Sequence, residues 1–225
     1  MRAMLTVLLG AATIAAGCGG DSGTSATKSS SQATASKTSA TTSPTNTTDP
    51  VVEVSEYSGG KVSPVIAAPE LGLHTWNGKA VRIGDYHGKV VLVTFVYTHC
   101  PDICPLIIDN LVRVKERLGP EAKQLQIVAV SVDPKGDTPQ AVKRFLTAHR
   151  ATGRVDYLLG SRPQLEAAWS RWGIDARVDP ANPELVEHSG VIWGVDPKGR
   201  RVTFYPASGF DVTDIESDVR RLLDG

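Results

Sequence analysis

The chain alternates between dense apolar runs and segments whose apolar residues follow a helical spacing. Val90–Tyr97 and Leu125–Val132 are almost continuously apolar, which is typical of strands buried on both faces of a sheet. Between them the apolar residues fall at helical spacing until about Leu118, where Gly119-Pro120 ends the helix. These segments predict strands of a sheet covered by helices.

Turn and cap residues delimit the other elements. Asn77-Gly78, between two apolar segments, predicts a hairpin at the start of the folded part. Thr213-Asp214-Ile215-Glu216 predicts a capping box that begins the last helix. The remaining expected elements are a helix from Pro139, capped by Asp137 or Thr138, to about His149, a strand at 155–159, a helix from 161 to about 172, and a hairpin of 190–195 with 201–205. This order predicts an α/β, thioredoxin-like fold: a mixed central sheet flanked by helices, with an added N-terminal β-hairpin.

Residues 1–18 have the pattern of a secretory signal. One positive charge, Arg2, precedes an apolar core too short for an ordinary membrane helix. Ala15-Ala16-Gly17-Cys18 resembles the lipobox of bacterial lipoproteins, although Ala15 stands where that pattern usually has Leu. We therefore expect lipid modification of Cys18. The alternative is conventional cleavage, which would leave Cys18 as an odd, reactive thiol.

Residues 19–50 contain no Val, Ile, Leu, Met or aromatic residue and are dominated by Ser, Thr, Ala and Gly. Such a composition cannot offset the entropy of ordering, so we expect a disordered tether with a span of about 30 Å. The folded domain is then expected at 51–225.

With 24 basic and 24 acidic residues, the chain gives no electrostatic case for binding nucleic acid.

Cys100 and Cys104 are the cysteines of the folded part, at the junction of a strand and a helix. Unpaired N–H groups and the helix dipole favour a thiolate there. One pair is too few for a disulfide scaffold or for a zinc site of four cysteines. Three residues separate the pair, instead of the two of CxxC redox enzymes, and two thiolates that share a metal tolerate a wider separation than a disulfide does. The spacing favours a metal without excluding reversible oxidation, and soft sulfur selects Cu(I).

A buried copper site would be more secure with an imidazole ligand, and the chain offers five histidines. We expect His149 to be a solvated helix end, and His74 and His87 to be surface or turn residues. His99 adjoins the first cysteine, so backbone direction should turn it away from a shared metal. His188 follows a loop rich in Pro and Asn and precedes an apolar strand, which makes it the leading candidate. The alternative is a hydrogen-bonded loop histidine.

Four motifs in order resemble the Sco/SenC family of copper chaperones, over roughly Val65 to the C-terminus. They are Thr98-His99-Cys100-Pro101-Asp102-Ile103-Cys104-Pro105, Ser131-Val132-Asp133-Pro134-Lys135-Gly136-Asp137-Thr138-Pro139, Leu159-Gly160-Ser161, and His188-Ser189 followed by Val195-Asp196-Pro197-Lys198-Gly199. The resemblance implies that Cys100, Cys104 and His188 bind copper. Glu187 departs from the family, which usually has Asp before this histidine, and we expect it to affect only the orientation of the imidazole.

The resemblance also implies a role: delivering copper to the binuclear site on subunit II of cytochrome c oxidase, or reducing the cysteines of that site. A lipid anchor would hold the domain on the outer face of the bacterial cytoplasmic membrane, near this recipient. We expect Cu(I) bound by two sulfurs and one nitrogen, and Cu(II) as well if a further oxygen ligand completes a tetragonal set. An oxidised cysteine pair would require a thiol reductant of the thioredoxin type.

Asp102 and Asp133 are given supporting roles. Asp102, between the cysteines, is expected to be exposed and to contact a partner, whereas Asp133 is expected to cap or brace its loop. The main alternative function is a thiol–disulfide oxidoreductase with Cys100 as nucleophile. A thiol peroxidase is disfavoured because no Arg is placed near the cysteines in the local sequence.

Overall fold

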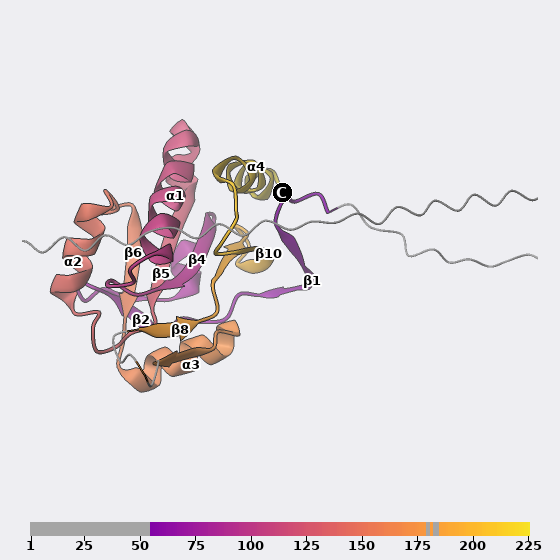
Figure 1. Cartoon of the computed structure of the whole chain (residues 1–225). Helices are drawn as coiled ribbons and strands as arrows, with labels where there is room; N and C mark the ends of the chain where they lie inside the picture. The colour runs from indigo at the N-terminus through magenta and orange to yellow at the C-terminus, as the bar shows by residue number, and fades with distance from the viewer. Residues whose placement is uncertain (1–54, 179–180, 182–184) are drawn as a thin grey trace, which may run out of the picture. The chain divides into compact units, whose positions relative to one another are not determined.

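The computed structural model describes residues 55–178, 181 and 185–225, which belong to one compact unit (Figure 1). The expected signal segment at 1–18 with Cys18, the expected tether at 19–50 and the start of the expected domain at 51–54 lie outside the described residues. In the described part, no helix combines the length and apolar character needed to cross a membrane.

The centre of the unit is a mixed sheet of eight strands in the order β1-β10-β9-β4-β5-β6-β2-β3. Strands β4, β5 and β6 are parallel, and every other pairing in the sheet is antiparallel. The strands are β1 (Gly60–Ala67), β2 (Leu73–Thr75), β3 (Ala80–Val81), β4 (Val90–Val96), β5 (Leu125–Ser131), β6 (Val155–Leu159), β9 (Val191–Val195) and β10 (Arg200–Pro206).

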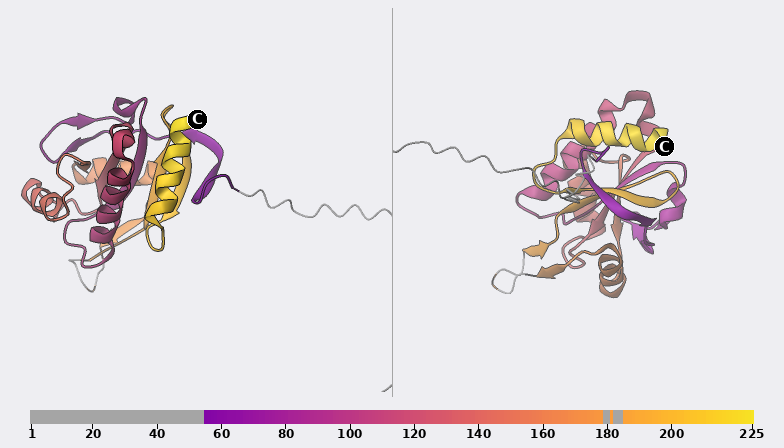
Figure 2. Two further views of the ribbon diagram at one scale, coloured as in Figure 1. Left: turned by 90° about the horizontal axis from the view of Figure 1, so that it is seen from above. Right: turned by 90° about the vertical axis from the view of Figure 1, so that its right-hand side faces the viewer.

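Helices cover both faces of this sheet (Figures 1 and 2). Helices α1 (Ile103–Arg117) and α4 (Val212–Asp224) pack against each other on one face, and α3 (Arg162–Trp172) lies on the other. Helix α2 (Pro139–Ala148) is joined to α1 by the contact between His149 and Asp109. Two 3₁₀ helices, η1 (Ile83–Tyr86) and η2 (Gly119–Gln124), complete the layers. The fold is thioredoxin-like.

The central strands follow the sequence pattern closely. All seven residues of β4 are buried, as its continuous apolar run predicts for a strand covered on both faces. Strand β6 has the expected ends, and α2 begins at Pro139 after Thr138, whose hydroxyl accepts a hydrogen bond from the Ala141 N–H. Strands β2 and β3 form the expected N-terminal hairpin, with shorter strands than the apolar segments suggest.

The predicted capping box of the last helix is wrong. Helix α4 begins two residues earlier, because the Asp211 carboxylate accepts a hydrogen bond from the Thr213 N–H. Thr213 is therefore already inside the helix, and Glu216 pairs with Arg117 and Arg220. By residue type, Asp211 is as good an N-cap as Thr213, so the sequence alone could not decide at which of the two residues the helix begins.

Two further features were not predicted. Strand β1 extends the sheet beyond β10, on the edge opposite the N-terminal hairpin. A separate two-stranded ribbon, β7 (Ala176–Val178) with β8 (Val186–His188), stands outside the main sheet. The second feature matters for function, because the candidate ligand His188 ends β8 instead of lying in a loop.

Candidate metal and redox site

The two cysteines lie together where β4 ends and α1 begins. Cys100 is in the connecting loop, and Cys104 is in the first turn of α1. The Cys104 N–H donates a hydrogen bond to the Cys100 sulfur, with an N–S distance of 3.4 Å. Both thiols are free and buried, Cys104 completely and Cys100 with 9% exposure. Access from solvent is therefore through Cys100.

The surroundings shift the pKa values of the two thiols in opposite directions. Hydrogen bonding from the Cys104 thiol, helped by the N–H groups of Asp102 and Cys104, lowers the pKa of Cys100 to about 5 against the effect of burial. The same shared hydrogen bond and burial raise the pKa of Cys104. At neutral pH the pair therefore holds one proton, with Cys100 as the thiolate and Cys104 as its donor.

A buried carboxylate, Asp137, ties the loop before Cys100 to the sheet. It accepts hydrogen bonds from the Thr98 N–H at 2.8 Å, the Ser131 hydroxyl at 2.6 Å and the Tyr157 hydroxyl at 2.7 Å. Burial raises the pKa of Asp137, and these three donors oppose that rise. The sequence offered Asp137 only as one of two possible helix caps. The cap is its neighbour Thr138, and Asp137 links Ser131 of β5 and Tyr157 of β6 to the cysteine loop.

Asp133 braces the same loop from outside. Its carboxylate lies 3.0 Å from the His99 Nε2 and accepts the Lys135 N–H at 3.0 Å. The two loops meet so closely at Gly136 that a Cβ there would lie 2.1 Å from the His99 Cε1 and 2.3 Å from the Asp133 Oδ2. The ring of His99 is therefore held toward Asp133. Asp102 is exposed and forms no side-chain cap on α1.

His188 reaches the cysteine site from the ribbon. It pairs with Ala176 at the end of β8, its Nδ1 lies 3.2 Å from the Ser189 carbonyl oxygen, and burial lowers the pKa of the imidazole. A neutral imidazole is the form that binds a metal. Glu187 precedes it with an exposed side chain.

Tyr97 lies between the histidine and the cysteines, and sequence reasoning did not single it out. Its buried ring packs edge-on against His188, with ring centroids 6.1 Å apart, and against His99 at 5.2 Å. Burial, followed by the Cys100 charge, raises the pKa of Tyr97 to about 12. Its place next to the Thr98-His99-Cys100 motif, at the end of a buried strand, was the available signal.

The structure thus brings Cys100 and Cys104 together and places His188 across Tyr97 from them. Across the described residues, no three His, Cys, Asp or Glu side chains lie close enough together to hold a metal ion as they stand.

The other histidines lie elsewhere. His149 ends α2 as expected, but its side chain is not freely solvated: its Nδ1 lies 2.9 Å from the Asp109 carboxylate, and its ring packs on Phe145 at 4.6 Å. His87 is exposed after η1, and the Nδ1 of His74 lies 3.0 Å from the Thr75 carbonyl oxygen in β2.

Comparison with known proteins gives the lineage. The family model described as SCO1/SenC matches residues 67–224, well over half of the chain. The chain belongs to the SCO1/SenC family. The human protein SCO2 homolog, mitochondrial, is 32% identical over 149 residues, 64% of this chain and 55% of that protein. The SCO1 protein homolog of Bacillus subtilis is 28% identical over 64% of this chain and 76% of its own length. This SCO1/SenC chain spans about half the length of the human relative.

Solved structures of family members superpose on the described fold. Bradyrhizobium japonicum ScoI with copper bound has a TM-score of 0.62 at 26% identity, covering 69% of this chain and 99% of that chain. Apo Sco1 from Thermus thermophilus has a TM-score of 0.66 at 27% identity, covering 76% and 99%. BsSco, described as a member of the Sco family of cytochrome c oxidase assembly proteins with a disulfide switch, has a TM-score of 0.60 at 26% identity, covering 73% and 97%.

Proposed function

We propose that this protein is a membrane-tethered copper chaperone that acts in the assembly of cytochrome c oxidase. The observation that carries the proposal is the pair of free, buried cysteines at the start of α1, of which Cys100 is the thiolate. Two sulfurs within hydrogen-bonding reach of each other form a preorganised pair of soft ligands. Such a pair suits Cu(I) better than harder cations.

In this proposal, Cys100, Cys104 and His188 hold one copper ion as cargo. His188 supplies the neutral imidazole, and binding releases the proton that the cysteine pair still holds. A relative at 26% identity has been solved with copper bound, which supports the same cargo here. Cu(II) is held as well if an oxygen ligand joins the set.

The proposed recipient is the binuclear copper site on subunit II of cytochrome c oxidase. BsSco, which belongs to a family of oxidase assembly proteins, supports this choice. Lipidation at Cys18 and the tether at 19–50 would keep the domain beside a membrane-bound recipient on the outer face of the bacterial membrane. Asp102, exposed between the two cysteines, is placed to contact it.

An anaerobic titration with Cu(I) against a competing chelator tests the site. We expect one tight equivalent for the reduced chain, and at least a tenfold loss of affinity in Cys100→Ser and in His188→Ala. His87→Ala, an exposed histidine on another surface, is the matched control and should bind as the parent does. No tight binding, or equal binding by His188→Ala and His87→Ala, would contradict the proposal.

The second candidate is a thiol–disulfide oxidoreductase, and the low pKa of Cys100 specifically favours it. Cys100 would attack a substrate disulfide, and Cys104 would resolve the mixed disulfide and leave the pair oxidised. A thioredoxin-type reductant would then restore the thiols. Reduction of a disulfide substrate that is lost in Cys100→Ser but unchanged in His188→Ala would identify this activity, because only copper binding uses the imidazole.

A further inference from the structure

The β1–β10–β9 end of the sheet carries side chains that the cysteine site does not use. Strand register places Ile66 opposite Arg201 and Phe204 opposite Trp193, and directly opposed residues share a face. The rings of Trp193 and Phe204 pack with centroids 5.8 Å apart, and the Arg201 guanidinium lies over the Trp193 ring at 4.6 Å. We call these four residues the arginine–aromatic face.

Arg201 is a cation that forms no ion pair with a carboxylate among the described residues. Its guanidinium is flanked by Trp193 and, at 5.7 Å, by Trp172 of α3, and its buried Nε has no hydrogen-bond partner. Among the described residues, no carboxylate forms an ion pair with it, and burial lowers its pKa with no acidic neighbour to oppose the effect. Stacking on indoles offsets part of this desolvation.

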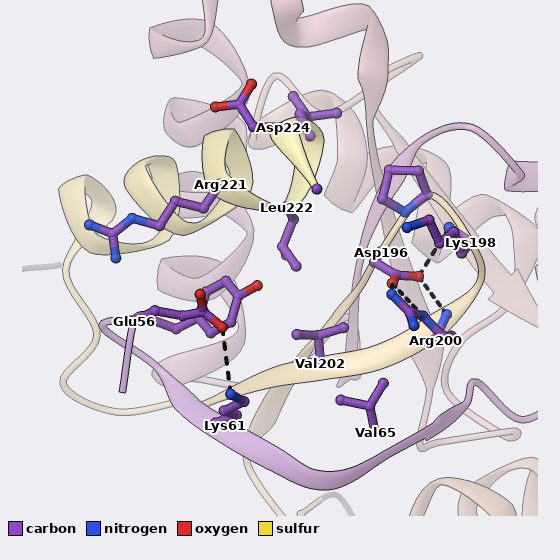
Figure 3. A pocket seen from close by; sticks show the side chains of 14 residues that line it. Glu56, Lys61, Val65, Asp196, Lys198, Arg200, Val202, Arg221, Leu222 and Asp224 are labelled. Atoms are coloured by element: carbon purple, nitrogen blue, oxygen red, sulfur yellow. Dashed lines mark hydrogen bonds and ion pairs between the residues drawn. The ribbon is translucent and has the colours of Figure 1, made fainter. Parts of the chain in front are cut away.

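The opposite face of the same strands shows the contrast (Figure 3). There a pocket of about 720 Å³ lies between α4, β1 and β10. In its lining, Lys61 pairs with Glu56 at 3.6 Å, and Arg200 pairs with Asp196 at 2.6 Å. Arg200 and Arg201 are adjacent in sequence, yet in the described part of the chain only Arg200, on the α4 face, pairs with a carboxylate.

Apolar side chains are exposed beside Arg201. Phe204 is 37% exposed and Ile66 is 42% exposed, and both belong to the short group of large apolar residues that remain open to solvent in the described domain. Strand β1 ends the sheet order, so no described strand lies beyond its outer edge. An exposed apolar patch beside an Arg and a Trp has the composition of a protein interface.

We propose that the arginine–aromatic face docks an acidic segment of a partner protein. A carboxylate of that segment accepts a pair of hydrogen bonds from the guanidinium of Arg201, and a neighbouring apolar side chain lies on Phe204 and Ile66. Charge complementarity selects the carboxylate, because a planar guanidinium held between aromatic rings presents its donors as a fixed fork. This surface is separate from the cysteine pair and does not depend on copper.

The test follows indole N–H signals by NMR in the full chain, labelled with ¹⁵N at its four tryptophans. The probe is the blocked peptide acetyl-Asp-Leu-Asp-Phe-amide, and its neutral match has Asn at both Asp positions. We expect a saturable shift of the Trp193 signal with the acidic peptide, without a comparable shift of Trp76. Binding should weaken at least fivefold for the neutral peptide and at least fivefold in Arg201→Gln.

Two further variants make the outcome decisive. Arg113→Gln removes an exposed positive charge on α1 and should leave binding unchanged. Phe204→Ser keeps Arg201 in place and should also weaken binding, which covers the case in which Arg201→Gln does not fold. Absence of a saturable shift, equal binding of the two peptides, or equal losses in Arg201→Gln and Arg113→Gln would overturn the proposal.

Discussion

The cysteine loop and the histidine ribbon differ in how firmly the fold holds them. The loop before Cys100 is fixed by the Thr98–Asp137 hydrogen bond, by the His99–Asp133 contact and by a fully buried strand. The ribbon is a two-stranded sheet outside the main one, tied at its base by the Ser189–Asp175 backbone hydrogen bond. If Cys100, Cys104 and His188 bind copper as proposed, the two sulfurs are the preorganised ligands and the imidazole is the less firmly held one. A site that must take up and release a metal benefits from one movable ligand.

Among the changes that test this contrast, loss of the Asp137 carboxylate is expected to have the largest effect on stability. We expect Asp137→Ala to lower the free energy of unfolding by about 3 kcal/mol or more, because it leaves the Thr98 N–H and the Ser131 hydroxyl without an acceptor and leaves the buried Tyr157 hydroxyl only the Val96 carbonyl oxygen. Urea denaturation measures this loss. Asp133→Ala, the matched change in the outer brace, should cost less than half as much. Equal losses would mean that the buried carboxylate has no special role in holding the loop.

The histidine ribbon should respond in the opposite way. His188→Ala is expected to change the free energy of unfolding by no more than about 0.5 kcal/mol, because the side chain is partly exposed and hydrogen-bonds only locally. A His188→Ala variant that loses affinity for Cu(I) but keeps its stability would show that His188 serves metal binding and not folding. A destabilisation as large as that of Asp137→Ala would show that the ribbon is an integral part of the folded core.

The sequence predicted the firmly held region better than the adjustable one. Continuous apolar runs specified β4 and β5, because a strand buried on both faces has few alternatives. Nothing local specified β7 and β8, whose pairing brings Ala176 beside His188. Likewise Asp137 looked like a helix cap, because its three donors come from Thr98, Ser131 and Tyr157 on separate segments. The site residues themselves came from motif order, and their copper ligation remains a prediction.

The pH dependence of alkylation sharpens the description of the cysteine pair. In the reduced, metal-free chain, the rate of iodoacetamide reaction at Cys100 should be half-maximal near pH 5, because the pKa of Cys100, about 5, lies far below that of an ordinary thiol. The rate falls below that pH as the thiolate is protonated and stays flat up to neutral pH. The Cys104→Ala variant should move the midpoint upward, because it removes the thiol that donates a hydrogen bond to the Cys100 thiolate. A midpoint near pH 8.5–9 in the parent would show that the shared hydrogen bond does not form.

The smallest expected effect concerns Tyr97, which separates the two regions. Tyr97→Phe keeps the ring that packs against His188 and removes only the hydroxyl, whose hydrogen bonding helps to lower the pKa of Cys100. The thiolate midpoint, followed by absorbance near 240 nm, should therefore rise by less than it does in Cys104→Ala, because the Tyr97 hydroxyl stabilises this thiolate less than the Cys104 thiol does. Tyr86→Phe removes a hydroxyl that bonds Asp156, away from the site, and should leave the midpoint unchanged. If Tyr97→Phe also leaves the thiolate midpoint unchanged, Tyr97 contributes only its ring to the site. The cysteine pair and the imidazole of His188 would then not be coupled through the Tyr97 hydroxyl.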